Sequence, residues 1–247
     1  MSVETIAVVL FGSAAAAFVC GLSGFAFGMV ALSVWVWVLE PAMLAPLVIF
    51  GSLVAQLITI RTAWAGADLR LLAPILIGGV CGVPLGAAAL TTIDPAQFRL
   101  AVGCVMVAYS TFMLLVRRPP RIDRWGGRAA DLVSGFVGGV MSGFAGLSAP
   151  APTIWGVLRG WEKDRLRCTL QVFNLAMHGS TTTAYLLNGT ITTGHAGIFA
   201  MMLPVLLVAA LVGARLYRML NDVAFRRIVL CLLFVGGLAM LGSAARG

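Results

Sequence analysis

The chain has 247 residues, of which 60% are hydrophobic and only 11% are charged, and its mean hydropathy is +1.01. Because a soluble domain carries about 25% charged residues, this composition excludes an ordinary water-soluble fold. The net charge of +8 would suggest a nucleic-acid partner in a soluble protein. Here the basic residues separate apolar runs, so they indicate membrane topology, and we expect no nucleic-acid partner.

Ten apolar segments follow one another along the chain, separated by short charged or Gly- and Pro-containing breaks. Runs of about 20 residues match a hydrocarbon core about 30 Å thick. Helices are expected there because a backbone without water must satisfy its own hydrogen bonds. The predicted segments are 5–21, 24–39, 41–60, 70–90, 98–117, 129–144, 149–158, 166–187, 195–215 and 226–243.

The first five segments and the last five look like two copies of one unit. Four short matches recur in the same order, pairing 18–21 with 136–139, 23–26 with 142–145, 86–87 with 213–214, and 98–99 with 225–226. The sequence therefore predicts two homologous repeats joined by a polar linker. The first repeat is 1–117, the cytoplasmic linker is 118–128 and the second repeat is 129–247.

The basic residues predict how these segments cross the membrane. Segments 5–39 and 129–158 are each too long for one crossing, and each breaks at Gly, Ser or Pro. If both are hairpins and the linker is cytoplasmic, every basic residue except Arg99 and Arg246 lies inside. Single crossings would instead divide the basic residues almost evenly between the two sides. The positive-inside rule therefore favours hairpins.

A hairpin plus three crossings gives each repeat an odd number of crossings, so two tandem copies have opposite orientations. The predicted fold is an all-α polytopic membrane protein with two halves in inverted orientation, the usual plan of a secondary transporter. Each half is a broken or re-entrant helical hairpin plus three transmembrane helices. Hairpin arms of about 10 to 16 residues would span about 15–24 Å, which favours re-entrant over fully spanning hairpins. We expect a multi-pass protein of the cell inner (plasma) membrane with both termini outside.

The breaks in the two hairpins form the first candidate substrate site. They contain Ser23-Gly24-Phe25 and Ser142-Gly143-Phe144. Glycine permits a tight turn and lets a ligand approach the backbone, and a helix that starts after the turn presents free N–H groups and a positive dipole end. Two such tips would bind an anion without a buried charge. The alternative is that the small residues serve close helix packing.

The second candidate site is a polar helix face within segment 166–187. Gln171, Asn174 and His178 fall at i, i+3 and i+7, so they share one face, and Gln56 lies in the corresponding segment of the first half. These side chains would bind an oxyanion at a transport pathway, or else they hydrogen-bond between helices without a substrate. The imidazole could also carry a proton near neutral pH.

Other classes of function find little support in the sequence. No acidic residue lies in the centre of a segment, which disfavours a cation as the substrate. The chain shows no nucleophile elbow, zinc-protease motif, phosphate-binding loop or dinucleotide fingerprint. We therefore expect no enzyme activity, no catalytic residues, no cofactor and no metal site.

The Gly-rich element that opens each half, the Gly-Ala pair that ends each fourth segment, and the Phe-Arg that follows it resemble the TauE/SafE family, whose members are also called sulfite exporter or anion permease proteins. The resemblance covers residues from about 8 to 243. It implies a plasma-membrane transporter or exporter of small sulfur-containing or organic anions, namely sulfite and sulfonates such as sulfoacetate. One departure is visible, because the second tip runs into the proline-containing stretch 149–152 and the first does not. The two tips are therefore not expected to bind identically.

Two alternatives stay open on the residues themselves. Opposed re-entrant hairpins also build anion channels, and a small carboxylate would suit the same hydrogen-bond donors as a sulfonate. A membrane enzyme or an assembly protein is a different class, which the sequence supports only weakly. The expected partners are a small anionic substrate and the lipid bilayer, with a homodimer as one alternative for the oligomeric state.

Overall fold

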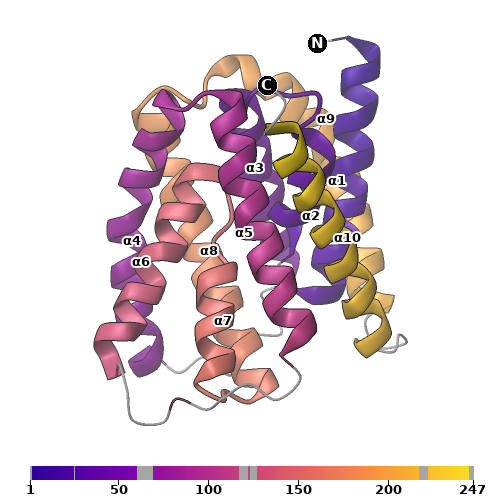
Figure 1. Ribbon diagram of the computed structural model, residues 1–247. Helices are drawn as coiled ribbons and strands as arrows, with labels where there is room; N and C mark the ends of the chain where they lie inside the picture. Colours follow the sequence, from indigo (N-terminus) through magenta and orange to yellow (C-terminus); the bar gives the residue numbers. More distant parts are fainter. Residues whose placement is uncertain are drawn as a thin grey trace.

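The structure, a computed structural model, is a bundle of α-helices (Figure 1). It describes residues 2–24, 26–59, 69–116, 122, 127–216 and 222–244, and these contain no strand. The ten predicted segments are confirmed, because each corresponds to one α-helix. The helices are α1 Val3–Ser23, α2 Phe27–Trp35, α3 Pro41–Thr59, α4 Leu69–Thr92, α5 Pro95–Leu115, α6 Gly127–Ala145, α7 Pro150–Leu158, α8 Lys163–Leu187, the short 3-10 helix η3 Thr193–His195, α9 Ala196–Leu216 and α10 Asp222–Ala244.

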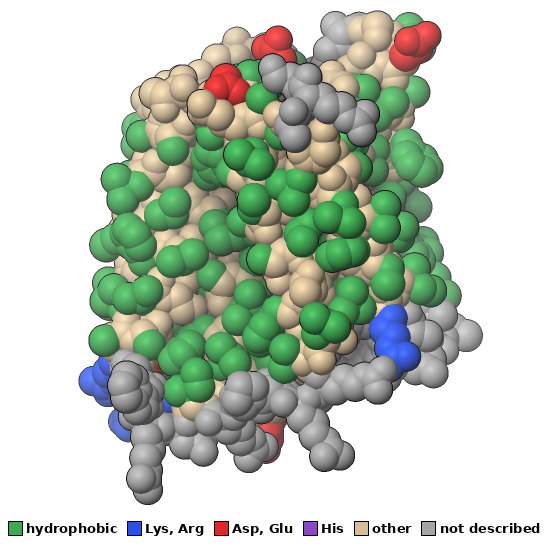
Figure 2. Space-filling model, in the orientation of Figure 1, with side chains coloured by type: hydrophobic (Ala, Val, Ile, Leu, Met, Phe, Trp, Pro, Cys, Tyr) green, Lys and Arg blue, Asp and Glu red, His purple; other side chains and the backbone are tan. Residues whose placement is uncertain are grey.

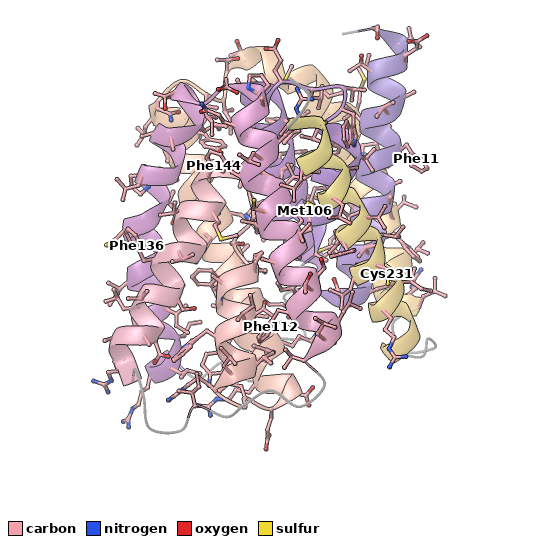
Figure 3. The ribbon with its side chains drawn as sticks, viewed as in Figure 1. Phe11, Met106, Phe112, Phe136, Phe144 and Cys231 are labelled. Atoms are coloured by element: carbon pink, nitrogen blue, oxygen red, sulfur yellow. The ribbon has the colours of Figure 1, made fainter. Side chains whose placement is uncertain are left out.

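The surface of the bundle is suited to a bilayer. Within the described residues, six helices are long and apolar enough to cross a membrane, namely α1, α3, α4, α5, α9 and α10. Apolar side chains such as Phe11, which is 69% exposed, point away from the bundle (Figure 3). Figure 2 shows a broad apolar band with Lys and Arg gathered at the lower end, while acidic side chains mark the upper end and also appear below.

Each half opens with a helix that breaks at a glycine and continues as a second, short helix. α1 ends at Gly24, whose φ of +87° lies in the left-handed region, and its N–H donates to the Cys20 carbonyl at 2.7 Å. α6 is followed by Gly146, with φ +73°, whose N–H donates to the Ser142 carbonyl at 2.8 Å. Such a left-handed residue ends a helix, and glycine adopts it with little strain.

The first arms of these hairpins are longer than the sequence predicted. α1 has 21 residues and α6 has 19, which correspond to about 31 Å and 28 Å, so the expected length of 10 to 16 residues was wrong for them. The helical hydrogen bonds continue through the small residues as far as the left-handed glycine. The second arms, α2 and α7, have 9 residues each, or about 13 Å, which is too short for a crossing.

The two hairpins open toward opposite ends of the bundle. Residues 36–41, which follow α2, line a pocket together with the start of α5, at the end where both chain termini lie (Figure 1). At the other end, the Ile122 N–H donates to the carbonyl of Leu158, the last residue of α7, at 2.9 Å. Of the predicted linker 118–128, only residues 122, 127 and 128 are among those described.

Helices of one half pack mainly against helices of the other. α4 lies on α6, α1 on α9, α5 on α10 and α3 on α8. Glycines allow the closest of these approaches, since a Cβ at Gly86 would lie 2.7 Å from the backbone N of Phe144, and one at Gly21 would lie 2.8 Å from that of Ala214. Small residues of this kind replace the hydrophobic driving force that helices lack within a bilayer.

This packing gives a first prediction. We expect Gly82→Ala to lower the unfolding temperature in detergent, because the new Cβ would lie 2.8 Å from the backbone N of Val140 and would push α4 from α6. Overpacking of this kind costs about 1–3 kcal/mol. Gly179→Ala on α8 is the control, since nothing lies within 4 Å of its Cβ position and alanine is the better helix former. Equal unfolding temperatures for the two variants would contradict the tight contact.

Candidate functional site

The polar face of α8 is buried inside the bundle. Gln171, Asn174 and His178 are exposed by only 0%, 1% and 4%. α3 packs across α8 and brings Gln56, which is 1% exposed, to the same region. Polar side chains at membrane depth are costly unless they are paired or serve a function, so this face is the first place to look for a site.

The first hairpin tip lies directly on this polar face. The Gln56 Nε2 donates to the Gly24 carbonyl at 3.2 Å and to the backbone carbonyl of Gln171 at 3.3 Å. A Cβ at Gly24 would lie 2.8 Å from the Gln171 Nε2. Glycine is therefore required at position 24 for two reasons, its left-handed backbone and the closeness of the amide. The structure thus brings three of the predicted site residues together.

The second hairpin tip reaches the same face of α8. The Ser148 hydroxyl, in the turn between α6 and α7, donates to the Asn174 Oδ1 at 2.7 Å. The tips also contact each other, since a Cβ at Gly28, at the start of α2, would lie 2.8 Å from the Gly146 carbonyl oxygen. The two breaks in the chain therefore converge beside α3 and α8.

The predicted residues of the second tip lie in the last turns of α6, before the turn itself. Ser142 is hydrogen-bonded to Thr181 of α8, with 3.0 Å between the hydroxyl oxygens, and the carbonyl of Gly143 accepts a bond from the Tyr185 hydroxyl at 2.7 Å. A Cβ at Gly143 would lie 2.8 Å from the backbone N of Ala87, so this glycine serves the packing of α6 on α4. Phe144 stacks toward α5 (Figure 3), with its ring centroid 5.1 Å from that of Phe98.

The remaining predicted residues belong to the first tip. The Ser23 hydroxyl donates to the Val19 carbonyl at 2.8 Å and accepts from the Ala26 N–H at 3.2 Å, so it closes the turn. Phe25 lies outside the described residues. Ser23 therefore shapes the tip through its own backbone contacts.

Several buried polar atoms of this cluster have no hydrogen-bond partner within the described part of the chain. They are the Ser52 Oγ, both side-chain ends of Gln171, the Asn174 Nδ2 and the His178 Nδ1. An unpaired buried group costs about 1–3 kcal/mol, so such a concentration points to a ligand. The two amide nitrogens are donors only, which suits an anion. No three His, Cys, Asp or Glu side chains of the described residues lie together as metal ligands would.

Sequence reasoning missed Ser52 and Ser148 as site residues. A signal for Ser52 exists, because the spacing from Ser52 to Asn174 equals both that from Gln56 to His178 and that from Gly24 to Gly146. The polar positions of α3 and α8 therefore correspond once the two turn glycines are aligned. Serine is common in membrane helices, and only this correspondence distinguishes Ser52.

The chain matches one family model, described as sulfite exporter TauE/SafE, over residues 8–240. No match to the chain was found among curated proteins or among solved structures. The family match runs through both hairpins and both polar faces, and it confirms the resemblance seen in the sequence. Since it covers nearly the whole chain, this multi-pass membrane protein belongs to the TauE/SafE sulfite exporter family of transport proteins.

Proposed function

We propose that the protein is a secondary transporter that exports a small sulfur-containing or organic anion, such as sulfite or a sulfonate like sulfoacetate, across the plasma membrane. The observation that carries this proposal is the set of unpaired buried donors, above all the Gln171 Nε2 and the Asn174 Nδ2, beside the two converging tips. Sulfite and sulfonates present three acceptor oxygens, and hydrogen bonds to a charged acceptor are stronger than neutral ones.

The surroundings of the cluster support an anion. Asp131 is the buried acid among the described residues, and it accepts a hydrogen bond from the Trp155 Nε1 at 2.7 Å near the start of α6. It lies three helical turns before Ser142, away from the tips. No described carboxylate therefore repels an anion bound beside α8.

The burial of the cluster supports a transporter over a channel. Gln171, Asn174 and His178 are exposed by 4% or less, whereas the lining of an open pore is in contact with water. A buried site between two hairpins needs a conformational change to open toward either side. Alternating access of that kind is what the proposed function requires.

The arrangement of the helices supports an inverted repeat. When the halves are exchanged, the pair α4 and α6 becomes α9 and α1, while the pairs α5 with α10 and α3 with α8 exchange onto themselves, and all of these pack together. Hairpins that open at opposite ends fit a two-fold axis in the membrane plane. With the basic lower end of Figure 2 in the cytoplasm, both chain termini would lie outside the cell.

Flux into proteoliposomes tests the function. Sulfite, sulfoacetate, thiosulfate, taurine and carboxylates of similar size would be compared, with and without a proton gradient. We expect saturable flux of the sulfur oxyanions, and a dependence on the gradient would direct attention to His178 as a proton carrier. Saturable flux of carboxylates alone would replace the substrate class, flux that does not saturate would indicate a channel, and no flux of any anion would contradict the proposal.

A further inference from the structure

We infer that Arg167 supplies the positive charge that holds the anion at the first hairpin tip, which makes the site one-sided; this inference rests on the proposed function. A Cβ at Gly24 would lie 3.5 Å from the Arg167 Nε and 2.8 Å from the Gln171 Nε2. A guanidinium N–H group and an unpaired amide donor thus converge on one point beside the tip. The planar fork of arginine matches an oxyanion better than any other cationic side chain.

The position of Arg167 on α8 fits a role at the entrance to the site. Arg167, Gln171, Asn174 and His178 follow one face of the helix at i, i+4, i+7 and i+11. Arg167 is half-buried, while the other three are buried. α8 begins near the end of α7 at the linker end of the bundle. An anion that arrives from this end would therefore meet Arg167 before it reaches the donors of the buried cluster.

The first half has no counterpart of this charge. With the spacing that relates Gly24 to Gly146, the positions that correspond to Arg167 and Gln171 are Ala45 and Ile49, both 0% exposed. The second tip is accordingly bordered by apolar groups, because a Cβ at Gly146 would lie 3.4 Å from the Ile49 Cδ1. The further polar positions occur in both halves, so charge recognition is what distinguishes the first tip.

Charge removal at position 167 gives the test. Arg167→Gln, Arg167→Lys and the control Arg165→Gln would be compared in proteoliposomes, where Arg165 is an exposed residue of the same turn. The substrates would be the dianion sulfoacetate and the monoanion methanesulfonate. We expect Arg167→Gln to raise the KM for sulfoacetate at least about tenfold and that for methanesulfonate by a smaller factor, because Coulomb attraction scales with the charge of the ligand. Arg167→Lys should recover part of the loss, and Arg165→Gln should behave as wild type.

The outcomes separate this inference from the proposed function. Binding is measured in parallel as the rise in unfolding temperature that each anion causes in detergent. If the wild type binds the anions but does not move them, the transport function fails, and the inference is decided by whether Arg167→Gln loses the dianion-dependent rise. Equal effects of Arg167→Gln and Arg165→Gln would overturn the inference, as would an equal loss for both anions with a lowered unfolding temperature. Absence of anion binding to the wild type would overturn both.

Discussion

Alanine in place of Gly24 is expected to reduce anion flux by at least about tenfold while the protein still inserts into the membrane. The new Cβ would lie 2.8 Å from the Gln171 Nε2, so it would displace the amide that we assign to the substrate. A side chain at φ +87° also strains the backbone, by about 1–2 kcal/mol. Both effects act at the point where the tip, α3 and α8 meet. Flux per inserted protein would be measured in proteoliposomes.

Gly189→Ala separates the steric effect from the backbone strain. Gly189 follows α8 with φ +76°, and nothing lies within 4 Å of its Cβ position. The two variants therefore carry a similar backbone cost, but only the one at position 24 meets the amide. Equal flux from the two variants would show that the space beside the first tip does not matter for transport.

The tips show how far a repeated motif predicts a local structure. The run length of apolar residues predicted ten helices, and the glycines predicted a break in each half. Matching sequence motifs aligned Gly24 with Gly143, but the left-handed turn of the second half lies at Gly146. Gly143 continues the helix because its backbone hydrogen-bonds as usual and its missing Cβ lets α6 approach α4. A short motif cannot distinguish a glycine that turns the chain from one that admits a neighbouring helix.

The polar residues were easier to foresee than their partners. Helical spacing placed Gln171, Asn174 and His178 on one face, and the structure buries that face against α3. The contact of this face with both tips depends on how four helices pack, which no local pattern encodes. Arg167 was counted only as a cytoplasmic charge, because the sequence does not show that its helix passes beside Gly24.

Aspartate in place of Asn174 is expected to reduce flux more than alanine does. The Asn174 Oδ1 accepts the Ser148 hydroxyl at 2.7 Å, and its Nδ2 is an unpaired donor. Asn174→Asp keeps an acceptor for Ser148 but replaces the donor by a second oxygen, which faces the anion with a negative charge or without the amide N–H. Asn174→Ala removes the donor alone, with an expected loss of about tenfold in apparent affinity, since a hydrogen bond to a charged group contributes about 1.5–3 kcal/mol.

The order of these two variants is the decisive result, because aspartate is the closer match to asparagine in shape. If Asn174 only joins α8 to the second tip, aspartate should preserve that bond and alanine should be the more harmful. If the Nδ2 binds the anion, the order reverses, with sulfoacetate KM and flux as the measurements. Gln97→Glu adds a carboxylate at an exposed position of α5 and serves as the control for the change in net charge. Flux from Asn174→Asp equal to that of the control would remove Asn174 from the site and leave recognition to Gln171 and the first tip.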